Sequence, residues 1–337
     1  MHGLEREVEE NARPLGVDVR AAAAAGGMRT LDVEGFASIL GVAPDAVPAR
    51  CREIIRTADF EHEVLEGPAR DAIVLGVLQA LEGDLSVAGP ARIEAWENGW
   101  GDVLARFEAS GCQPEELWPH YLRPERRVVR LDGEYVRPVA GTFEANFVRV
   151  MQAWFSETFL RDAASVYEFG CGPGHNLVAF AQSHPQRSYT GLDWATASQQ
   201  VLARVSSALN LDISGRRFDM LHPDTNFALA PDAGVVTFGA LEQLGTSFGP
   251  FLQYLRAAKP AICVHLEPVH ELYDRGSLFD FVAARYAEKR GYLQGYLTEL
   301  RALEEAGEVE ILHVKKHLGS LFHDGWVSLV WRPLRGR

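Results

Sequence analysis

The sequence predicts an α/β fold with a doubly wound, largely parallel sheet, preceded by a mostly helical N-terminal region. From residue 165 onward, short apolar runs alternate with amphipathic stretches, which is the pattern of successive βα units. The last two apolar runs lie too close together for a helical crossover, so we expect them to form an antiparallel hairpin. Residues 1–140 instead show helical periodicity. We therefore expect a helical N-terminal domain over 1–140 and an α/β domain over 141–337.

The N-terminal helices are predicted from apolar residues that recur at helical spacing. Pro44 and the Gly-Pro pairs at 67–68 and 89–90 separate these stretches. A tight β-hairpin is expected over 128–137, because an Asp-Gly pair at 132–133 divides two alternating runs. The predicted helices are Val33–Leu40, Val47–Ala58, Ala69–Leu81, Arg92–Ala109 and Thr142–Leu160.

The second half of the chain is predicted as strands and helices in turn. The expected strands are Ser165–Phe169, Ser188–Leu192, Ile213–Phe218, Ala233–Phe238, Ala261–Leu266, Val309–Leu318 and Val327–Trp331. The expected helices are His175–Ser183, Ala195–Leu209, a helix that runs through Leu252–Ala258, and a long helix over Ser277–Ala306.

Composition and charge narrow the classes of partner. A net charge of −13 over 337 residues opposes binding to a phosphate backbone. No apolar stretch is long enough to span a membrane, and Met1–Glu10 is acidic rather than basic and then apolar, unlike a signal peptide. The four cysteines form no CxxC pair, and Cys171 and Cys263 lie in apolar runs typical of buried thiols. We expect a cytoplasmic protein with a small-molecule substrate and no nucleic-acid or membrane partner, and a homodimer stays open.

A glycine-rich segment follows the first predicted strand of the α/β half. Residues 168–174 read Glu-Phe-Gly-Cys-Gly-Pro-Gly and directly precede a predicted helix. Such a loop at the first βα junction is a nucleotide-cofactor site. The dinucleotide pattern GxGxxG requires its third glycine at position 175, which is His175 here, while Gly174 comes one residue earlier. The spacing and the preceding acid, Glu168, favour S-adenosylmethionine (SAM), which has a sulfonium and an amino acid but no pyrophosphate.

Acidic residues end the next two predicted strands. Asp193 follows the second strand at about the 20-residue spacing of a ribose-binding acid. Trp194 could lie along the adenine, and Asp219 is placed to meet the adenine amino group. Glu242 lies where the substrate-facing loop should begin after the fourth strand. Two alternatives stay open, an NAD-dependent oxidoreductase and a non-catalytic regulator that kept a cofactor-binding fold.

With these motifs, residues 165–333 resemble the Rossmann-like class I SAM-dependent methyltransferases, which also end in an antiparallel hairpin. The resemblance implies that three glycines surround the methionine part of SAM, while one acid holds the ribose and an acid-methionine pair contacts the adenine. It also implies that residues 1–140 form a cap on the substrate side. The expected cofactor-binding residues are Glu168, Gly170, Cys171, Gly172, Gly174, Asp193, Trp194, Asp219 and Met220.

Five of the eleven histidines lie between 265 and 323, in segments expected near the carboxyl ends of the strands. If residues 270–274 are helical, His270 and Asp274 share one face, and His323 could join them as ligands of a divalent metal. We expect His265 to be packed in a strand, and His313 and His317 to be solvated. The predicted catalytic residues are His175, Glu242 and His270.

The segments Glu267–Asp274 and Gly319–Trp326 also resemble the carboxyl O-methyltransferases of β-lactone (cystargolide and belactosin) biosynthesis. That resemblance implies an isopropylmalate-like hydroxy-acid as methyl acceptor and a metal held by two histidines and an aspartate. Sugars and phenolic natural products are the alternative acceptors.

Overall fold

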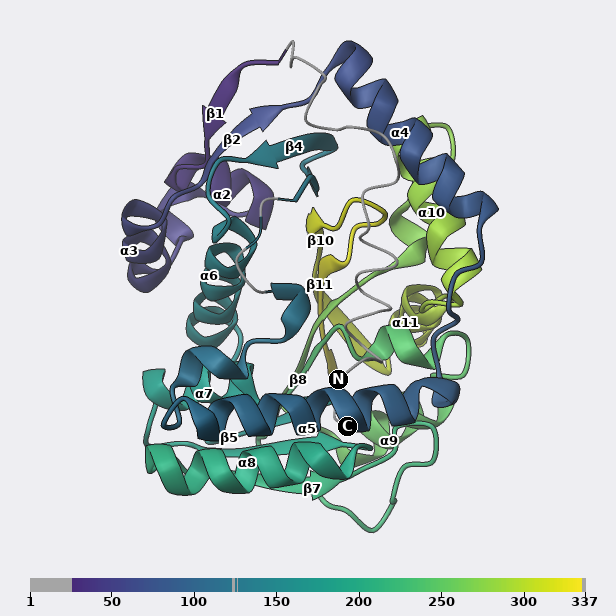
Figure 1. The fold of residues 1–337 in the computed structure, drawn as a ribbon. Coiled ribbons are helices and arrows are strands. Elements are labelled where there is room, and N and C mark those ends of the chain that lie inside the picture. The colour runs from purple at the N-terminus through teal and green to yellow at the C-terminus, as the bar shows by residue number, and fades with distance from the viewer. Residues whose placement is uncertain (1–25, 123–124, 126, 335–337) are drawn as a thin grey trace.

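The computed structural model describes residues 26–122, 125 and 127–334. Its strands form one sheet in the order β1-β2-β4-β3-β10-β11-β9-β8-β5-β6-β7 (Figure 1). The parallel part consists of β5 (Ser165–Phe169), β6 (Ser188–Asp193), β7 (Ile213–Arg217), β8 (Gly234–Phe238) and β9 (Ile262–Glu267).

The strand order reverses beside β5. The chain moves outward from β5 through β6 to β7 and then returns to the other side of β5 with β8 and β9. In a parallel sheet, ligands bind beyond the carboxyl ends of the strands at such a switch point. This topology confirms the predicted doubly wound sheet and places a crevice between β5 and β8.

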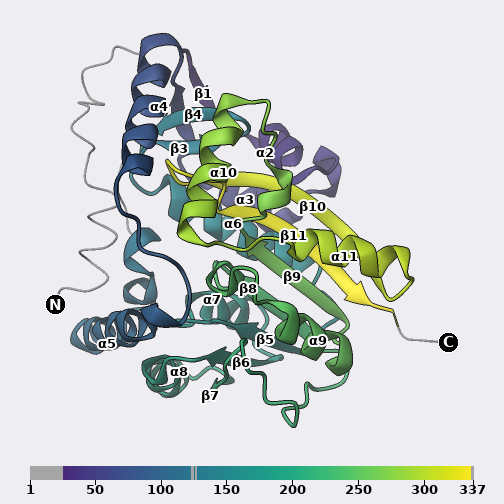
Figure 2. The ribbon, with the colours of Figure 1, turned by 90° about the vertical axis from the view of Figure 1, so that its right-hand side faces the viewer.

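Helices cover both faces of the parallel strands, because successive strand residues point to opposite sides. In β8, Val236 packs in one core and its neighbour Val235 in another, on opposite faces of the sheet. The helices α6 (Phe143–Thr158), α7 (His175–Ser183) and α8 (Thr196–Leu209) contribute to the core of Val236, and α9 (Gly249–Ala258) and α11 (Tyr296–Glu305) contribute to the core of Val235. Figure 2 shows α9 and α11 beside the sheet from the side.

The last two strands, β10 (Val309–Gly319) and β11 (Trp326–Pro333), pair antiparallel, and β11 also pairs with β9. The far end of β10 pairs with β3 (Val129–Leu131), where Leu318 lies opposite Leu131. The N-terminal strands therefore continue the sheet of the α/β half. The remaining strands are β4 (Glu134–Pro138), β2 (Glu61–Val64) and β1 (Met28–Thr30).

The N-terminal part is less purely helical than its sequence predicts, since β1 and β2 were not expected. Both strands are short, and all three residues of β1 are exposed. In β2 burial alternates, but one of the two buried residues is His62, so its sequence shows no apolar alternation. The expected hairpin is β3 and β4, with Asp132 and Gly133 at φ values of 49° and 82° as a tight turn of this type requires. The predicted helices correspond to α2 (Val33–Leu40), α3 (Ala49–Thr57), α4 (Gly67–Glu82) and α5 (Ile93–Ala109).

The prediction of one long helix over 277–306 was wrong. The structure has α10 (Leu278–Arg290) and α11, which are separated by two glycines with positive φ, Gly291 at 64° and Gly295 at 91°. Gly291 ends α10 in the left-handed conformation, which residues with a Cβ rarely adopt. The chain thus turns between two helices, and α10 packs against α4 at the upper right of Figure 1.

Short 3₁₀ helices connect these elements, and none of the described helices is long and apolar enough to cross a membrane. The 3₁₀ helices are η1 (Pro44–Ala46), η2 (Pro90–Arg92), η3 (Pro114–Leu117), η4 (His120–Leu122), η5 (Leu241–Leu244) and η6 (His270–Leu272).

Candidate active site

A cavity of about 700 Å³, counting the part open to solvent, lies at the switch point of the sheet. The loops after β5, β6, β7 and β8 line one side, and four residues of the N-terminal part line the other: Trp96, Trp100, Pro119 and Tyr121. Among the predicted site residues, the lining includes Glu168, Gly170, Cys171, Gly172, His175, Asp193, Trp194, Asp219 and Met220.

The glycine loop is packed tightly on two sides. Gly170 has a φ of 70°, and a Cβ there would lie 2.3 Å from the Ala240 Cβ. Gly172 has a φ of 51°, and a Cβ there would lie 2.8 Å from the Trp100 ring. Both positions therefore require glycine for conformation and for space. Gly174 is the N-cap of α7 and is not among the lining residues.

Asp193 connects the end of β6 to the glycine loop. Its Oδ2 accepts a hydrogen bond of 2.9 Å from the Gly172 amide, and its Oδ1 accepts one of 2.8 Å from the Ala195 amide. Burial raises the pKa of the Asp193 carboxyl to about 6, although these amides favour the charged form. The structure therefore brings the acid and the loop together, and ribose binding by Asp193 stays a prediction.

Glu168 lies under the loop with one satisfied and one unsatisfied oxygen. Its Oε1 accepts a 2.7 Å hydrogen bond from Asn176, whose own side-chain oxygen accepts one of 2.7 Å from Gln152. The buried Oε2 has no hydrogen-bond partner among the described residues. Burial raises the pKa of Glu168 to about 8. A positively charged ligand group beside this carboxyl would stabilise its ionised form and give Oε2 a partner.

Asp219 and Met220 border the cavity beyond β7. Asp219 Oδ1 accepts a hydrogen bond from the Leu221 amide at 2.8 Å, and its Oδ2 lies 2.9 Å from His222 Nδ1. These contacts hold the Asp219 side chain in a local turn. Its predicted contact with adenine is not tested by the structure.

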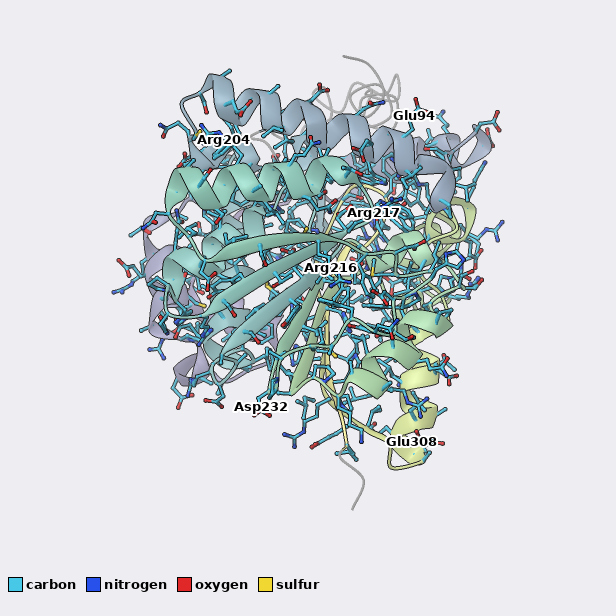
Figure 3. All side chains as sticks on the ribbon, turned by 90° about the horizontal axis from the view of Figure 1, so that it is seen from below. Glu94, Arg204, Arg216, Arg217, Asp232 and Glu308 are labelled. Carbon is cyan, nitrogen blue, oxygen red and sulfur yellow. The ribbon has the colours of Figure 1, made fainter. Side chains whose placement is uncertain are left out.

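Helix α5 covers the glycine loop from the N-terminal part. Trp96 and Trp100 stack with ring centroids 5.3 Å apart. Between them, Glu97 accepts hydrogen bonds of 2.6 and 2.8 Å from the amides of Thr196 and Ala197, so it caps the N-terminus of α8. Figure 3 shows α5 and α8 side by side. The sequence prediction missed the two tryptophans, although their i, i+4 spacing on an amphipathic helix places them on one face.

Besides the acids, the polar side chains that line the cavity are His175, Tyr121, Asn176 and Gln243. Burial lowers the pKa of His175 to about 3, and its Nδ1 has no partner among the described residues. His175 is therefore neutral, and its ring lies 5.4 Å from that of Trp118. Burial and the negative charges of nearby glutamates raise the pKa of Tyr121.

Glu242, a predicted catalytic residue, lies beside the cavity but is not among its described lining residues. Its neighbour Gln243 lines the cavity and donates a 3.0 Å hydrogen bond to Glu242 Oε1. Burial raises the pKa of Glu242, and the charges of Arg290 and Arg92 lower it. The catalytic role predicted for Glu242 is therefore untested.

The predicted metal site was wrong, because the structure does not bring its three residues together. Only His270–Leu272 is helical, and Tyr273 is extended, so Asp274 leaves the face of His270. His270 Nε2 lies 3.3 Å from a glutamate, whereas His323 stacks on Tyr286 with centroids 5.3 Å apart. No group of three or more His, Cys, Asp or Glu side chains with the geometry of a metal site occurs in the described part of the chain. His270 is also not among the lining residues of the cavity, and the catalytic role predicted for it is untested.

Two further histidine predictions had opposite outcomes. His265 is fully buried in β9, as expected. The expectation that His317 is solvated was wrong, since it is 2% exposed and hydrogen bonded to Ile39 O and Ser328 Oγ. The N-terminal helix α2 covers this part of β10, which the alternation along the strand could not reveal. His313 beside it is half-buried.

No protein-family model and no curated protein matches the chain. Among solved structures, it is similar to the 4+2 cyclase SpnF, with 13% identity, 74% of this chain and 100% of that chain covered, and a TM-score of 0.49. Geranyl diphosphate methyltransferase in complex with SAM has 13% identity, coverages of 62% and 98%, and a TM-score of 0.42. The plantazolicin methyltransferase BpumL in complex with a substrate analogue and SAH has 12% identity, with 73% of this chain and 98% of that chain covered, and a TM-score of 0.39.

Proposed function

We propose that the chain is a SAM-dependent methyltransferase that binds its cofactor in the switch-point cavity. The observation that carries this proposal is the buried, unpartnered Glu168 Oε2 beside the glycine loop. Three carboxyl groups and no Lys or Arg are among the described lining residues. An acidic lining opposes a pyrophosphate and favours a ligand with a sulfonium and an ammonium group. The glycine loop and Asp193 would hold SAM, which would supply an electrophilic methyl group.

We further propose that the methyl acceptor is an oxygen of a small natural-product acid, such as the carboxylate of an isopropylmalate-like hydroxy-acid. A carboxylate is ionised at neutral pH and needs positioning rather than a base. Since no Lys or Arg is among the described lining residues, the neutral donors His175 and Tyr121 would hold it. With its pKa lowered to about 3, His175 is too weak a base to ionise an alcohol, but as a neutral ring it can donate or accept one hydrogen bond. Sugar and phenol hydroxyls, the alternative acceptors, would require a stronger base.

Titration calorimetry with SAM and with NAD tests the cofactor. We expect micromolar binding of SAM and a loss of at least about tenfold in Asp193→Asn, because one carboxylate oxygen next to Gly172 becomes a donor. Asp212→Asn, an exposed acid that precedes β7, is the matched control and should bind as the wild type does. Binding of NAD without SAM, or unchanged binding in Asp193→Asn, would overturn the proposal.

Turnover is tested by following S-adenosylhomocysteine formation with hydroxy-acids, sugars and phenols. We expect product with a hydroxy-acid, and methyl-ester formation distinguishes carboxyl from hydroxyl transfer by mass and by its lability to mild alkali. Turnover only with a phenol or sugar would refute the carboxylate acceptor while leaving the cofactor assignment intact.

A further inference from the structure

Glu267 is a fully buried acid at the end of β9, close to the cavity but outside its lining. Its Oε1 accepts a 2.9 Å hydrogen bond from the Ala240 amide, and its Oε2 accepts one of 3.3 Å from the Glu242 amide. The Leu241 amide also hydrogen bonds to this carboxyl group. One side chain therefore holds three successive amides of the loop after β8.

That loop forms one wall of the cavity. Gly239, Ala240, Gln243 and Leu244 line it, and the Ala240 methyl group occupies the space that a side chain at Gly170 would need. A shift of Ala240 would therefore change the fit of the glycine loop against this wall. The carboxylate of Glu267 determines where the wall lies, since it is the acceptor for the amides that carry it.

A chain of polar groups leads from β11 through β9 and β8 to Glu267. Trp331 Nε1 can only donate, and it donates to His265 Nε2 at 2.9 Å. The proton of the neutral His265 ring is therefore on Nδ1, which lies 2.9 Å from Thr237 Oγ1 and donates to it. The Thr237 hydroxyl is left with its own proton to donate. Thr237 pairs with His265, and Glu267 lies two residues farther along β9 on the same face, where donation from Thr237 lowers the pKa of its carboxyl.

We infer that Glu267 is a positioning residue for the cavity wall and that Trp331, His265 and Thr237 set its charge by directing a proton toward it. An ionised carboxylate accepts from all of these donors, whereas a protonated one would carry an O–H where only donors face it. The three strands thus favour the form of Glu267 that keeps the loop in place. The inference rests on the proposed function only in its use of SAM as a probe.

The surroundings of Glu267 both raise and lower the pKa of its carboxyl. Burial raises the pKa of Glu267 to about 8, and the nearby Glu242 raises it further, while the Ala240 amide and the Thr237 hydroxyl lower it. The charge of Glu267 contributes to the raised pKa values of Tyr121 and Tyr296, and the Tyr296 hydroxyl lies 3.3 Å from His265 Nε2. Glu267 therefore titrates within the accessible pH range, so the donation from Thr237 becomes measurable.

The test compares the affinity for SAM of the wild type and of Thr237→Val between pH 6 and 9.5. Valine has nearly the same shape as threonine but no hydroxyl. In the wild type, affinity should rise as Glu267 ionises. Without the Thr237 donor the pKa of Glu267 goes up, so the midpoint should move to higher pH by about 0.5–1 unit. Thr190→Val on β6, two strands away from β8, is the control. Its hydroxyl bonds to Ser214, so this variant should leave the midpoint in place.

Further variants show which group causes the pH-dependent step in SAM affinity. Glu168 and Asp193 also titrate in the cavity, so Glu267→Gln identifies the step that belongs to Glu267, because only that step should vanish. Trp331→Phe together with Tyr296→Phe removes both groups that contact His265 Nε2 and should shift the midpoint in the same direction as Thr237→Val. Adding Thr237→Val to this pair should shift the midpoint no further than Thr237→Val alone. An unchanged midpoint in Thr237→Val, or additive shifts, would overturn the inference.

A readout without ligand separates this inference from the cofactor proposal. Amide hydrogen exchange of the segment 239–244 should be faster in Glu267→Gln and in Thr237→Val than in the wild type at the same pH, since the wall loses its acceptor or its acceptor's charge. Unchanged exchange would refute the positioning role even if SAM binds. Conversely, if SAM does not bind to the wild type, faster exchange would still support the positioning role.

Discussion

At the scale of single residues, an acid that lines the cavity, Glu168, and one beside it, Glu267, lie in an environment that disfavours their charge. Glu168 and Glu267 are both at most 1% exposed, and burial raises both of their pKa values to about 8. Such carboxyls make the ligand-free protein less stable than neutral residues of the same shape would. Ionisable groups with disfavoured charge and a cost in stability are common at sites that bind charged ligands.

Glu168→Gln tests this cost, because glutamine keeps the oxygen that accepts from Asn176. Since the folded-state pKa of Glu168 is raised above its unfolded value of 4.5, the wild type loses stability as pH rises from about 4.5 to 8. The variant lacks that loss, so its melting temperature relative to the wild type should be higher at pH 8 than at pH 5, by on the order of 2 °C or more. Calorimetric scans at both pH values measure this.

The same variant should bind SAM about tenfold more weakly at pH 8.5, where the wild-type carboxyl is largely ionised. Glu53→Gln, at an exposed position of α3, should change neither property. A melting difference that is equal at pH 5 and pH 8 would contradict the role given to the buried charge.

At the scale of elements, α5 joins the N-terminal part of the chain to the cofactor side of the sheet. Its two tryptophans line the cavity, and its Glu97 accepts hydrogen bonds from the N-terminus of α8. One helix therefore both borders the cavity and is attached to the α/β part. Figure 3 shows Glu94 on the same helix, where it is exposed. The two glutamates are three residues apart and face different surroundings, which makes them a matched pair.

Glu97→Ala should lower the free energy of unfolding by about 1 kcal/mol, the usual cost of a lost N-terminal cap. It should also weaken SAM binding severalfold, because Trp96 and Trp100 lose the contact that fixes α5 over the loop. Denaturant unfolding and calorimetry measure the two effects. Glu94→Ala should be neutral in both, and a stability loss without any change in binding would show that α5 does not shape the site.

At the scale of the whole molecule, the N-terminal and α/β parts share one sheet and one core. Phe36 of α2, Trp100 of α5 and Val264 of β9 belong to the same cluster of buried residues. His317 links the parts directly, since its Nδ1 donates to Ile39 O at 3.0 Å and its Nε2 lies 2.6 Å from Ser328 Oγ. We therefore expect the described parts to unfold together rather than as independent units.

His317→Gln tests this link and its dependence on pH. Burial lowers the pKa of His317 to about 3, so its contribution is complete above pH 6.5 and is lost as the pH falls toward 3. The variant should be about 1 kcal/mol less stable at pH 7 and should lose less stability between pH 7 and 5 than the wild type. Urea unfolding at the two pH values measures this. His222→Gln, at an exposed site, should leave the pH dependence unchanged, and equal slopes for His317→Gln and the wild type would contradict the assignment.

Local sequence determined the central elements and the loop between them. β5 and α7 have the predicted bounds, because an apolar strand, a glycine turn and an amphipathic helix are each specified by neighbouring residues. The glycines and the acids at 168 and 193 were also predictable, since strand ends and chain order place them at one edge of the sheet.

Tertiary structure decided what no local pattern contains. The pairing of β3 with β10 joins residues nearly 200 positions apart, and the tryptophans of α5 reach the glycine loop only because the chain folds back across it. The predicted metal site shows the reverse. Helical spacing suggested that His270 and Asp274 share one face, but the extended backbone at Tyr273 separates them. Local residues choose elements because hydrogen bonding and side-chain entropy act over a few positions, whereas the composition of a site depends on long-range packing.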